Sequence, residues 1–323
     1  MKKVTALLLS LMMLMMTCAA FAESVAVVYP SSVDDKGWCQ AMDSGIRTAI
    51  DNGLEIDYTP VENVDTANAA NILQQLAGEY DLVIIHGAQF SAALSEVAEE
   101  YPEQVFAVGT SDAIFGDNVF SYMPQSEEPG YVNGIIAGLI TKVNKVGIVG
   151  STDGGDSARY VRGFVMGLKA SNPDCEYMLS WTNSFGDTAG AGDIAQTQIK
   201  AGCDVLVGPA QQAIGAIRAV AASENVTFVG QTISQLEDFP EVVVAAADYA
   251  YGAVVSAILE QVAGGVTGGI CIPMNYNNGG FVYAFSENAD LLPADVQAAA
   301  QEALSALEAT PDTLAGYVDV ELN

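Results

Sequence analysis

The chain has 323 residues, and its 40 acidic residues against 11 lysines and arginines give a formal net charge of −29. This negative charge excludes nucleic acids and anionic membrane surfaces as partners. The single histidine, His86, excludes a multi-histidine metal site, and the length is enough for two domains with cores of their own.

Residues 1–22 have the pattern of a secretory signal peptide, with two lysines, a short apolar run and a small-x-small end at Ala20 and Ala22. The run is too short for a normal membrane span, and we expect cleavage before Glu23. The alternative is a lipid anchor at Cys18. It is disfavoured because methionine and threonine stand three and one residues before that cysteine, where a lipobox has leucine and glycine or alanine. The sequence therefore predicts a secreted, periplasmic or extracytoplasmic protein.

Four scattered cysteines follow the leader, none with C-x-x-C spacing: Cys39, Cys175, Cys203 and Cys271. This spacing argues against a structural zinc site, and we expect neither a metal ion nor a cofactor. Cys175 and Cys203 each lie near a predicted strand. Either a disulfide between them or two small buried thiols fits the sequence.

Short runs rich in valine and isoleucine alternate along the chain with longer stretches of helical period. The first unit is predicted to have strands at 25–29, 54–59, 82–85 and 105–108, and helices at 38–52, 66–78 and 90–100. The pattern repeats at an offset of about 121 residues, with strands at 146–150, 176–181, 204–207 and 226–229, and helices at 157–171, 188–201 and 212–223. Val25–Ser32 (VAVVYPSS), for example, parallels Val146–Thr152 (VGIVGST). Apolar strands separated by amphipathic helices indicate parallel sheets covered on both faces.

After each unit comes one more strand and helix, where we expect the chain to cross between lobes: 118–122 with 128–141, and 241–246 with 250–262. The predicted fold class is α/β, with two doubly wound parallel-sheet lobes joined by crossover segments. The expected N-terminal lobe comprises residues 23–124 and 249–276, and the C-terminal lobe 125–248 and 277–323. A strand at 281–285 and a helix at 293–307 complete the second lobe.

Ligands of open α/β sheets bind outside the carboxyl ends of the strands, and those ends are rich in two kinds of side chain. Aromatic rings suited to stacking on a flat ligand are Trp38, Phe90, Trp181, Phe185, Tyr249 and Tyr251. Carboxylates and amides suited to reading donors and acceptors on a ring edge are Asp34, Asp35, Asp112, Gln211, Gln231 and Asp248. For any one of the aromatic residues, core packing is the competing interpretation.

The motif Asp34-Asp35-Lys36-Gly37-Trp38, followed seven residues later by Gly45, resembles the basic membrane protein (BMP) family of ABC-transporter substrate-binding proteins. Trp181–Asp187 (WTNSFGD) and Gly202–Val205 (GCDV) also resemble that family, which includes purine and purine-nucleoside receptors. The resemblance implies a type I periplasmic-binding fold in which Trp38 stacks on the purine. It also implies ligand contacts from Asp34 or Asp35, Phe90 and Asp112 in the first lobe, and from Gln211, Gln231 and Asp248 in the second.

The sequence departs from the nucleoside-binding members at two places. Their aspartate-containing G-V-D-x-D-Q stretch is replaced here by Gly230–Gln235 (GQTISQ), and their lysine after the next strand by Ala247-Asp248-Tyr249. These losses favour a free nucleobase or another small ring over a nucleoside. We expect an extracytoplasmic solute-binding protein of an ABC importer, with a small-molecule ligand, an ABC permease as partner and no catalysis.

Two other functions remain as alternatives. A ligand-sensing protein that serves a signalling receptor has the same architecture, and the sequence does not separate it from an importer component. A secreted α/β enzyme is disfavoured. The glycines after the predicted strand at 146–150 lack G-x-G-x-x-G spacing, and no G-x-S-x-G nucleophile elbow is present.

Overall fold

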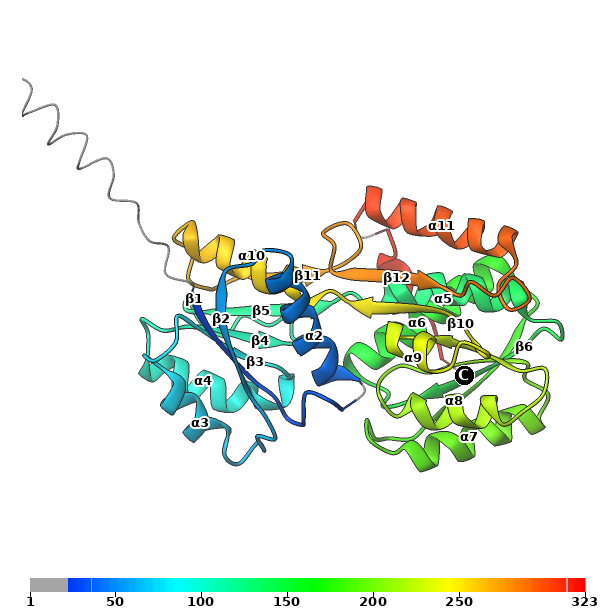
Figure 1. Ribbon diagram of the computed structural model, residues 1–323, viewed down its shortest axis with the longest axis horizontal. Coiled ribbons are helices and arrows are strands. Elements are labelled where there is room, and N and C mark those ends of the chain that lie inside the picture. The colour runs from blue at the N-terminus through cyan, green and yellow to red at the C-terminus, as the bar shows by residue number, and fades with distance from the viewer. Residues whose placement is uncertain (1–22, 36, 312, 323) are drawn as a thin grey trace, which may run out of the picture.

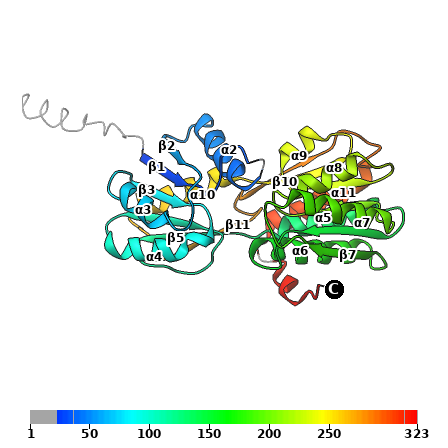
Figure 2. The ribbon, with the colours of Figure 1, turned by 90° about the horizontal axis from the view of Figure 1, so that it is seen from below.

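The computed structural model describes residues 23–35, 37–311 and 313–322. Its strands form two six-stranded sheets, and Figures 1 and 2 show the two resulting lobes side by side. The predicted leader and Cys18 lie outside the described residues. Cys175 and Cys203, whose pairing the sequence left open, are both buried free thiols.

The first sheet has the order β11-β5-β4-β3-β1-β2 and is parallel throughout. Its strands are β1 (Glu23–Val28), β2 (Ile56–Val61), β3 (Leu82–Ile85), β4 (Val105–Gly109), β5 (Val119–Pro124) and β11 (Cys271–Met274). Its helices are α2 (Trp38–Asp51), α3 (Ala69–Leu76), the 3₁₀ turn η1 (Ala88–Phe90), α4 (Ser91–Glu100) and α10 (Tyr251–Ala263).

The second sheet has the order β12-β10-β9-β8-β6-β7, in which only the β10–β12 pair is antiparallel. Its strands are β6 (Lys145–Gly150), β7 (Glu176–Trp181), β8 (Val205–Val207), β9 (Thr227–Gly230), β10 (Val243–Tyr249) and β12 (Phe281–Phe285). Its helices are α5 (Glu127–Ile140), α6 (Gly155–Ser171), α7 (Thr188–Lys200), α8 (Ala213–Ala221), α9 (Ile233–Asp238), α11 (Ala294–Ala309) and the 3₁₀ turn η2 (Ala315–Asp319).

The two sheets repeat one topology, because each places its first five strands in the order 5-4-3-1-2. This confirms the duplication and the α/β fold class predicted from sequence. The chain passes from the first sheet to the second after β5, returns after β10 and crosses again after β11. The lobe boundaries at residues 124, 248 and 276 stay a prediction.

Alternating strand residues explain why both faces of each sheet are covered. On β3, Leu82 and Ile84 face the core beneath α2 and α10, whereas Val83 and Ile85 face the core beneath α3 and α4. All four side chains are buried, as the continuous apolar run predicts. In the second lobe, α5 and α6 cover one face and α7 and α8 the other.

Two elements are absent from the sequence prediction, namely β11 and α9. Strand β11 has four residues and contains Pro273, which is tolerated because the strand lies at the edge of its sheet. The same tolerance lets edge strand β2 run through Pro60 to Val61, two residues beyond its predicted end.

A cleft between the lobes

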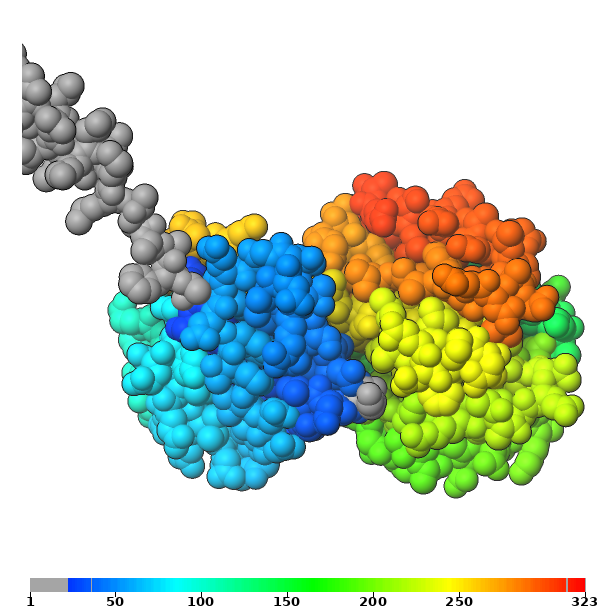
Figure 3. Space-filling model, viewed as in Figure 1, coloured from blue at the N-terminus to red at the C-terminus, as the bar shows by residue number. Residues whose placement is uncertain are grey.

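The carboxyl ends of the parallel strands face one another across a cleft of about 550 Å³. Figure 3 shows the two lobes meeting at a waist. The first-lobe wall of the cleft is formed by Pro30, Ser31, Gly37, Trp38, Gly87, Ala88, Gln89 and Thr110. Its second-lobe wall is formed by Thr152, Gly154, Gly155, Asp156, Ser157, Phe185, Pro209, Ala210, Gln211, Gln231, Thr232, Gln235 and Tyr249. The volume suits a small molecule, and the position is the one that open α/β sheets use for ligands.

Trp38, the first residue of α2, contacts three other rings, of which Tyr249 belongs to the second lobe. It stacks on His86 with ring centroids 4.6 Å apart and planes 11° apart. Tyr249 and Tyr251 meet it edge-on at 5.3 and 5.4 Å. These contacts fix the indole while leaving it on the surface of the cleft.

His86 directly follows β3 and is fully buried behind Trp38. Its Nδ1 lies 2.8 Å from the hydroxyl of Tyr122, and its Nε2 lies 3.3 Å from the backbone oxygen of Trp38. Burial lowers the pKa of His86 to about 3, so the ring is neutral at physiological pH. His86 therefore supports Trp38 from behind, and it is not among the residues that line the cleft.

The loop that leads into α2 is anchored by hydrogen bonds of its own. Asp35 accepts hydrogen bonds from the backbone N–H groups of Gly37, Cys39 and Gln40, which satisfies the start of the helix. Glu62 accepts one from the backbone N–H of Val33 at 2.8 Å. The loop and the position of Trp38 are thereby fixed.

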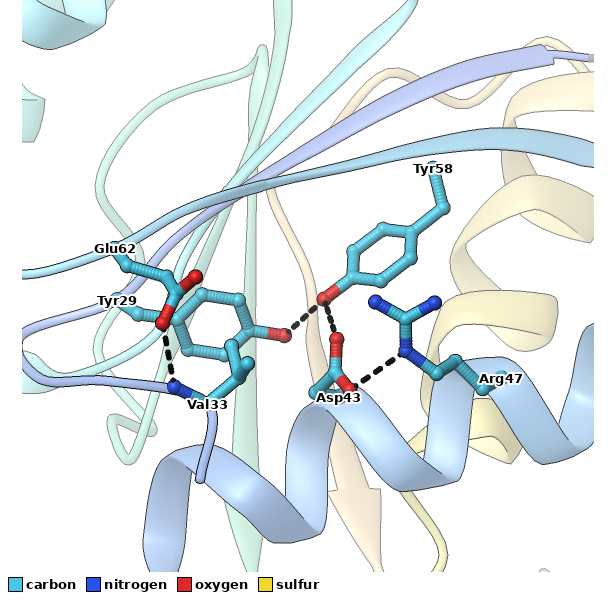
Figure 4. A network of polar contacts seen from close by, with 6 residues as sticks. All are labelled: Tyr29, Val33, Asp43, Arg47, Tyr58 and Glu62. Atoms are coloured by element: carbon cyan, nitrogen blue, oxygen red, sulfur yellow. Dashed lines mark hydrogen bonds and ion pairs between the residues drawn. The ribbon is translucent and has the colours of Figure 1, made fainter. Parts of the chain in front are cut away.

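A polar network ties the body of α2 to the sheet (Figure 4). The hydroxyl of Tyr29 lies 2.7 Å from that of Tyr58, which donates to Asp43 at 2.8 Å. Asp43 also pairs with Nε of Arg47 at 2.7 Å. Tyr29 directly follows β1, and Tyr58 belongs to the neighbouring strand β2. The network therefore holds α2 against the strands that precede and follow it.

The second-lobe wall is polar and interconnected. Tyr249 donates from its hydroxyl to Oδ2 of Asp156 at 2.9 Å and accepts from Nε2 of Gln231 at 2.8 Å. Oε1 of Gln231 in turn accepts from the backbone N–H of Ala210. Burial raises the pKa of Asp156 to about 6, even though nearby hydroxyls and Arg159 act to lower it.

Two non-glycine residues on the cleft wall adopt left-handed backbone: Thr110 after β4, with φ 59°, and Ala210 after β8, with φ 65°. Such strained positions persist only where surrounding structure enforces them, and they cluster at functional sites. Their presence on both walls agrees with a binding role for the cleft.

Five of the predicted residues line the cleft: Trp38, Phe185, Gln211, Gln231 and Tyr249. The structure places the other seven elsewhere. Asp34 and Asp112 are exposed outside the lining, and Asp35 caps α2. Phe90 and Tyr251 are buried in the cores.

The remaining two residues, Trp181 and Asp248, also lie outside the cleft lining. Trp181 pairs across the sheet with Gly150 and packs against the core. Asp248 lines a separate hollow of about 570 Å³ between α2, α9 and α10, where it accepts from the backbone N–H groups of Ile233 and Tyr249. Burial raises the pKa of Asp248 to about 6.

Sequence reasoning missed Asp156 as a site residue, along with Gln89, Thr110 and Thr152. Asp156 lies in the loop after β6, at the first turn of α6, which was recognised as a strand end. The available signal was a carboxylate in that loop, a feature that Asp153 shares with Asp156. The sequence did not show that Asp156 would be drawn into the cleft while its neighbour Asp153 stays exposed.

Among the described residues, no group of three or more histidine, cysteine or carboxylate side chains is placed to hold a metal ion. No helix within the same residues is long and apolar enough to cross a membrane.

The sequence matches the Bmp family, described as ABC transporter substrate-binding protein PnrA-like, over residues 22–304. The chain belongs to the Bmp family. This confirms the resemblance seen in the sequence motifs. The Bmp family is one of substrate-binding proteins, not of enzymes.

Relatives of this Bmp-family chain have different ligands in their names. A putative ABC transporter glucose-binding protein of Haloferax volcanii is 30% identical over 200 residues, covering 61% of this chain and 50% of the relative. A purine-binding protein of Brucella abortus is 27% identical over 196 residues, covering 58% and 55%. The chain thus spans about half the length of the curated relatives it matches.

A solved structure extends the similarity over nearly the whole chain. A solute-binding protein of an ABC transporter system from Conexibacter woesei superposes with a TM-score of 0.75 at 24% identity, covering 94% of this chain and 99% of that one. This likeness agrees with the two-lobed periplasmic-binding fold.

Proposed function

We propose that this protein is the extracytoplasmic binding component of an ABC importer and holds a purine base or nucleoside between its lobes. The observation that carries the proposal is the pair of aromatic side chains on opposite walls of one cleft. Trp38 comes from the first lobe, and Phe185, 49% exposed, comes from the second. An exposed phenylalanine beside a fixed indole suits a flat ring enclosed between the lobes.

The polar groups of the cleft suit an uncharged ligand. Among the described lining residues there is no lysine or arginine, and the amides of Gln89, Gln211 and Gln235 carry both donors and acceptors. The purine-binding relative supports a purine, whereas the glucose-binding relative makes a sugar the competing ligand. An ABC permease is the partner that this function requires.

Calorimetric titration with adenine, guanine, hypoxanthine and their nucleosides tests the proposal. Trp38→Leu removes the aromatic face but keeps bulk, and should weaken binding about tenfold to a hundredfold, since stacking a base on an aromatic ring contributes about 1–3 kcal/mol. Trp38→Phe keeps a ring and should retain most of the affinity.

Trp181→Phe is the matched control, because it alters the other tryptophan, which lies outside the cleft lining. It should leave affinity unchanged even if the melting temperature falls. Wild-type protein that binds none of these purines, or Trp38→Leu that binds as the wild type does, would contradict the proposal.

A further inference from the structure

Asp156 is the only carboxylate among the described residues that line the cleft, and its hydrogen bonding is incomplete. Oδ2 accepts from the hydroxyl of Tyr249 at 2.9 Å. The hydroxyl of Ser126 is close enough to lower the pKa of Asp156, but neither Ser126 Oγ nor Asp156 Oδ1 has a hydrogen-bond partner in acceptable geometry. Buried polar atoms in native proteins are normally partnered, so an orphaned carboxylate oxygen at a binding cleft requires an explanation.

Within the part of the chain that the structure describes, no lysine or arginine forms an ion pair with this carboxylate. Arg159, which lies one turn further along α6, is held by Glu127 through two hydrogen bonds of 2.8 and 2.9 Å. Its attraction for Asp156 is opposed by Glu127 itself. Gln231 is also engaged, because its two amide atoms bind Tyr249 and Ala210.

The groups that face Asp156 are therefore two hydroxyls, one arginine already neutralised by a glutamate, and that glutamate. Together these groups do not fully compensate the negative charge of the ionised Asp156 carboxylate. A ligand that donates a hydrogen bond would complete its partners, whereas an anionic ligand would be repelled.

Resting on the proposed function, we propose that Asp156 is a specificity-determining residue that accepts a hydrogen bond from an N–H group of the ligand and excludes anions such as nucleotides. A donor favours the ionised carboxylate, so ligand binding is coupled to proton release when the free protein has Asp156 protonated. Affinity for such a ligand then falls as the pH is lowered through the pKa of Asp156, which is about 6.

The test compares Asp156→Asn with Asp153→Asn, an identical charge change at an exposed aspartate in the same loop. Guanosine, inosine, adenosine and guanosine 5′-monophosphate are titrated into each protein at pH 7.5 and pH 5.0. At pH 7.5, Asp156→Asn should weaken nucleoside binding about tenfold or more, as expected for loss of a hydrogen bond to a charged acceptor.

Asp153→Asn should bind within about twofold of wild type, and the monophosphate should bind wild type at least about tenfold more weakly than guanosine. Wild-type affinity should fall about tenfold between pH 7.5 and 5.0, while that of Asp156→Asn stays level. Nucleoside binding by Asp156→Asn within twofold of wild type overturns the assignment and leaves the proposed function standing.

Failure of the wild type to bind any purine overturns the proposed ligand, and Asp156 is then tested by thermal shift with sugars, amides, amines and carboxylates. A stabilising N–H donor whose shift is lost in Asp156→Asn, but not in Asp153→Asn, supports the assignment. A ligand that is an anion, or the absence of any ligand, overturns it.

Discussion

The two lobes share one strand order but differ where they meet the ligand. The first lobe presents the indole of Trp38, backed by a histidine that stays neutral. The second presents Asp156 and Tyr249, linked by a hydrogen bond. Duplication has kept the scaffold, whereas the loops at the strand ends have diverged in the side chains that they place in the cleft. Function lies in those loops and not in the repeated sheet.

The lobes also differ in how tightly their crossing helices pack. In the first lobe, α2, the helix that follows β1, lies against the crossover helix α10. In the second lobe, α6, the helix that follows the counterpart strand β6, lies against the crossover helix α5. A Cβ on Gly134 of α5 would overlap the backbone carbonyl of Phe164 in α6. A Cβ on Gly45 of α2 would lie 3.1 Å from the backbone nitrogen of Tyr251. A Cβ on Gly252 of α10 would, however, overlap the backbone carbonyl of Gly45. In the first-lobe pair the tight contact is therefore limited by α10, whereas in the second-lobe pair both helices are limited, because a Cβ on Gly167 of α6 would overlap the backbone carbonyl of Tyr131.

The largest expected contrast concerns the ion pair in each lobe. Arg159 pairs with buried Glu127 and its side chain is only 18% exposed, whereas the side chain of Arg47, paired with Asp43, is 58% exposed. Arg159→Met should lower the free energy of unfolding by about 3 kcal/mol, because Glu127 loses its counter-charge. Arg47→Met should cost about 0.5 kcal/mol. Urea denaturation of both variants measures the difference, and equal losses would show that the lobes do not differ in this respect.

The next contrast lies in the helix pairs. Gly134→Ala should lower the free energy of unfolding by about 2 kcal/mol, since α5 and α6 must separate to admit a methyl group. Gly45→Ala should be nearly neutral, because a gain in helix propensity of about 1 kcal/mol offsets mild crowding. Thermal denaturation of the two variants is the measurement. A larger loss for Gly45→Ala would reverse the comparison.

The smallest contrast is in pH dependence, and the two walls should differ in sign. The folded-state pKa of His86, about 3, lies below the ordinary value of 6.5, so below pH 6.5 the unfolded state binds a proton that the folded state does not. This costs stability at about 1.4 kcal/mol per pH unit as the pH falls. Asp156, with a folded-state pKa raised to about 6, instead adds stability as the pH falls from 6 toward 4.

Denaturation at pH 7 and pH 5 separates these contributions. His86→Gln should reduce the loss of stability on acidification. Asp156→Asn should increase that loss, because the variant lacks the compensating proton uptake of the folded protein. If both variants lose the same free energy of unfolding between pH 7 and pH 5 as the wild type, then neither His86 nor Asp156 has the shifted pKa that its surroundings imply.

Much of the scaffold could be predicted because it depends on patterns that extend over many residues. The strands at Leu82–Ile85 and Phe281–Phe285 have the bounds that their apolar runs predict. The site was harder to predict, because strand-end membership does not determine where a side chain points. Phe90 follows β3 as expected, but its 3₁₀ turn buries the ring in the core. Asp35 accepts hydrogen bonds from backbone N–H groups at the start of α2. Asp156 lines the cleft because it lies in the first turn of α6.

The most direct test is mass spectrometry of the small molecule released by denaturing protein that was purified without refolding. The cleft, lined by Trp38 and Phe185 and by the carboxylate of Asp156, predicts an unmodified, uncharged purine base or nucleoside in an amount comparable to the protein. A phosphorylated compound or another anion would contradict the assignment of Asp156. A sugar in place of a ring with N–H donors would contradict the proposed ligand of the cleft.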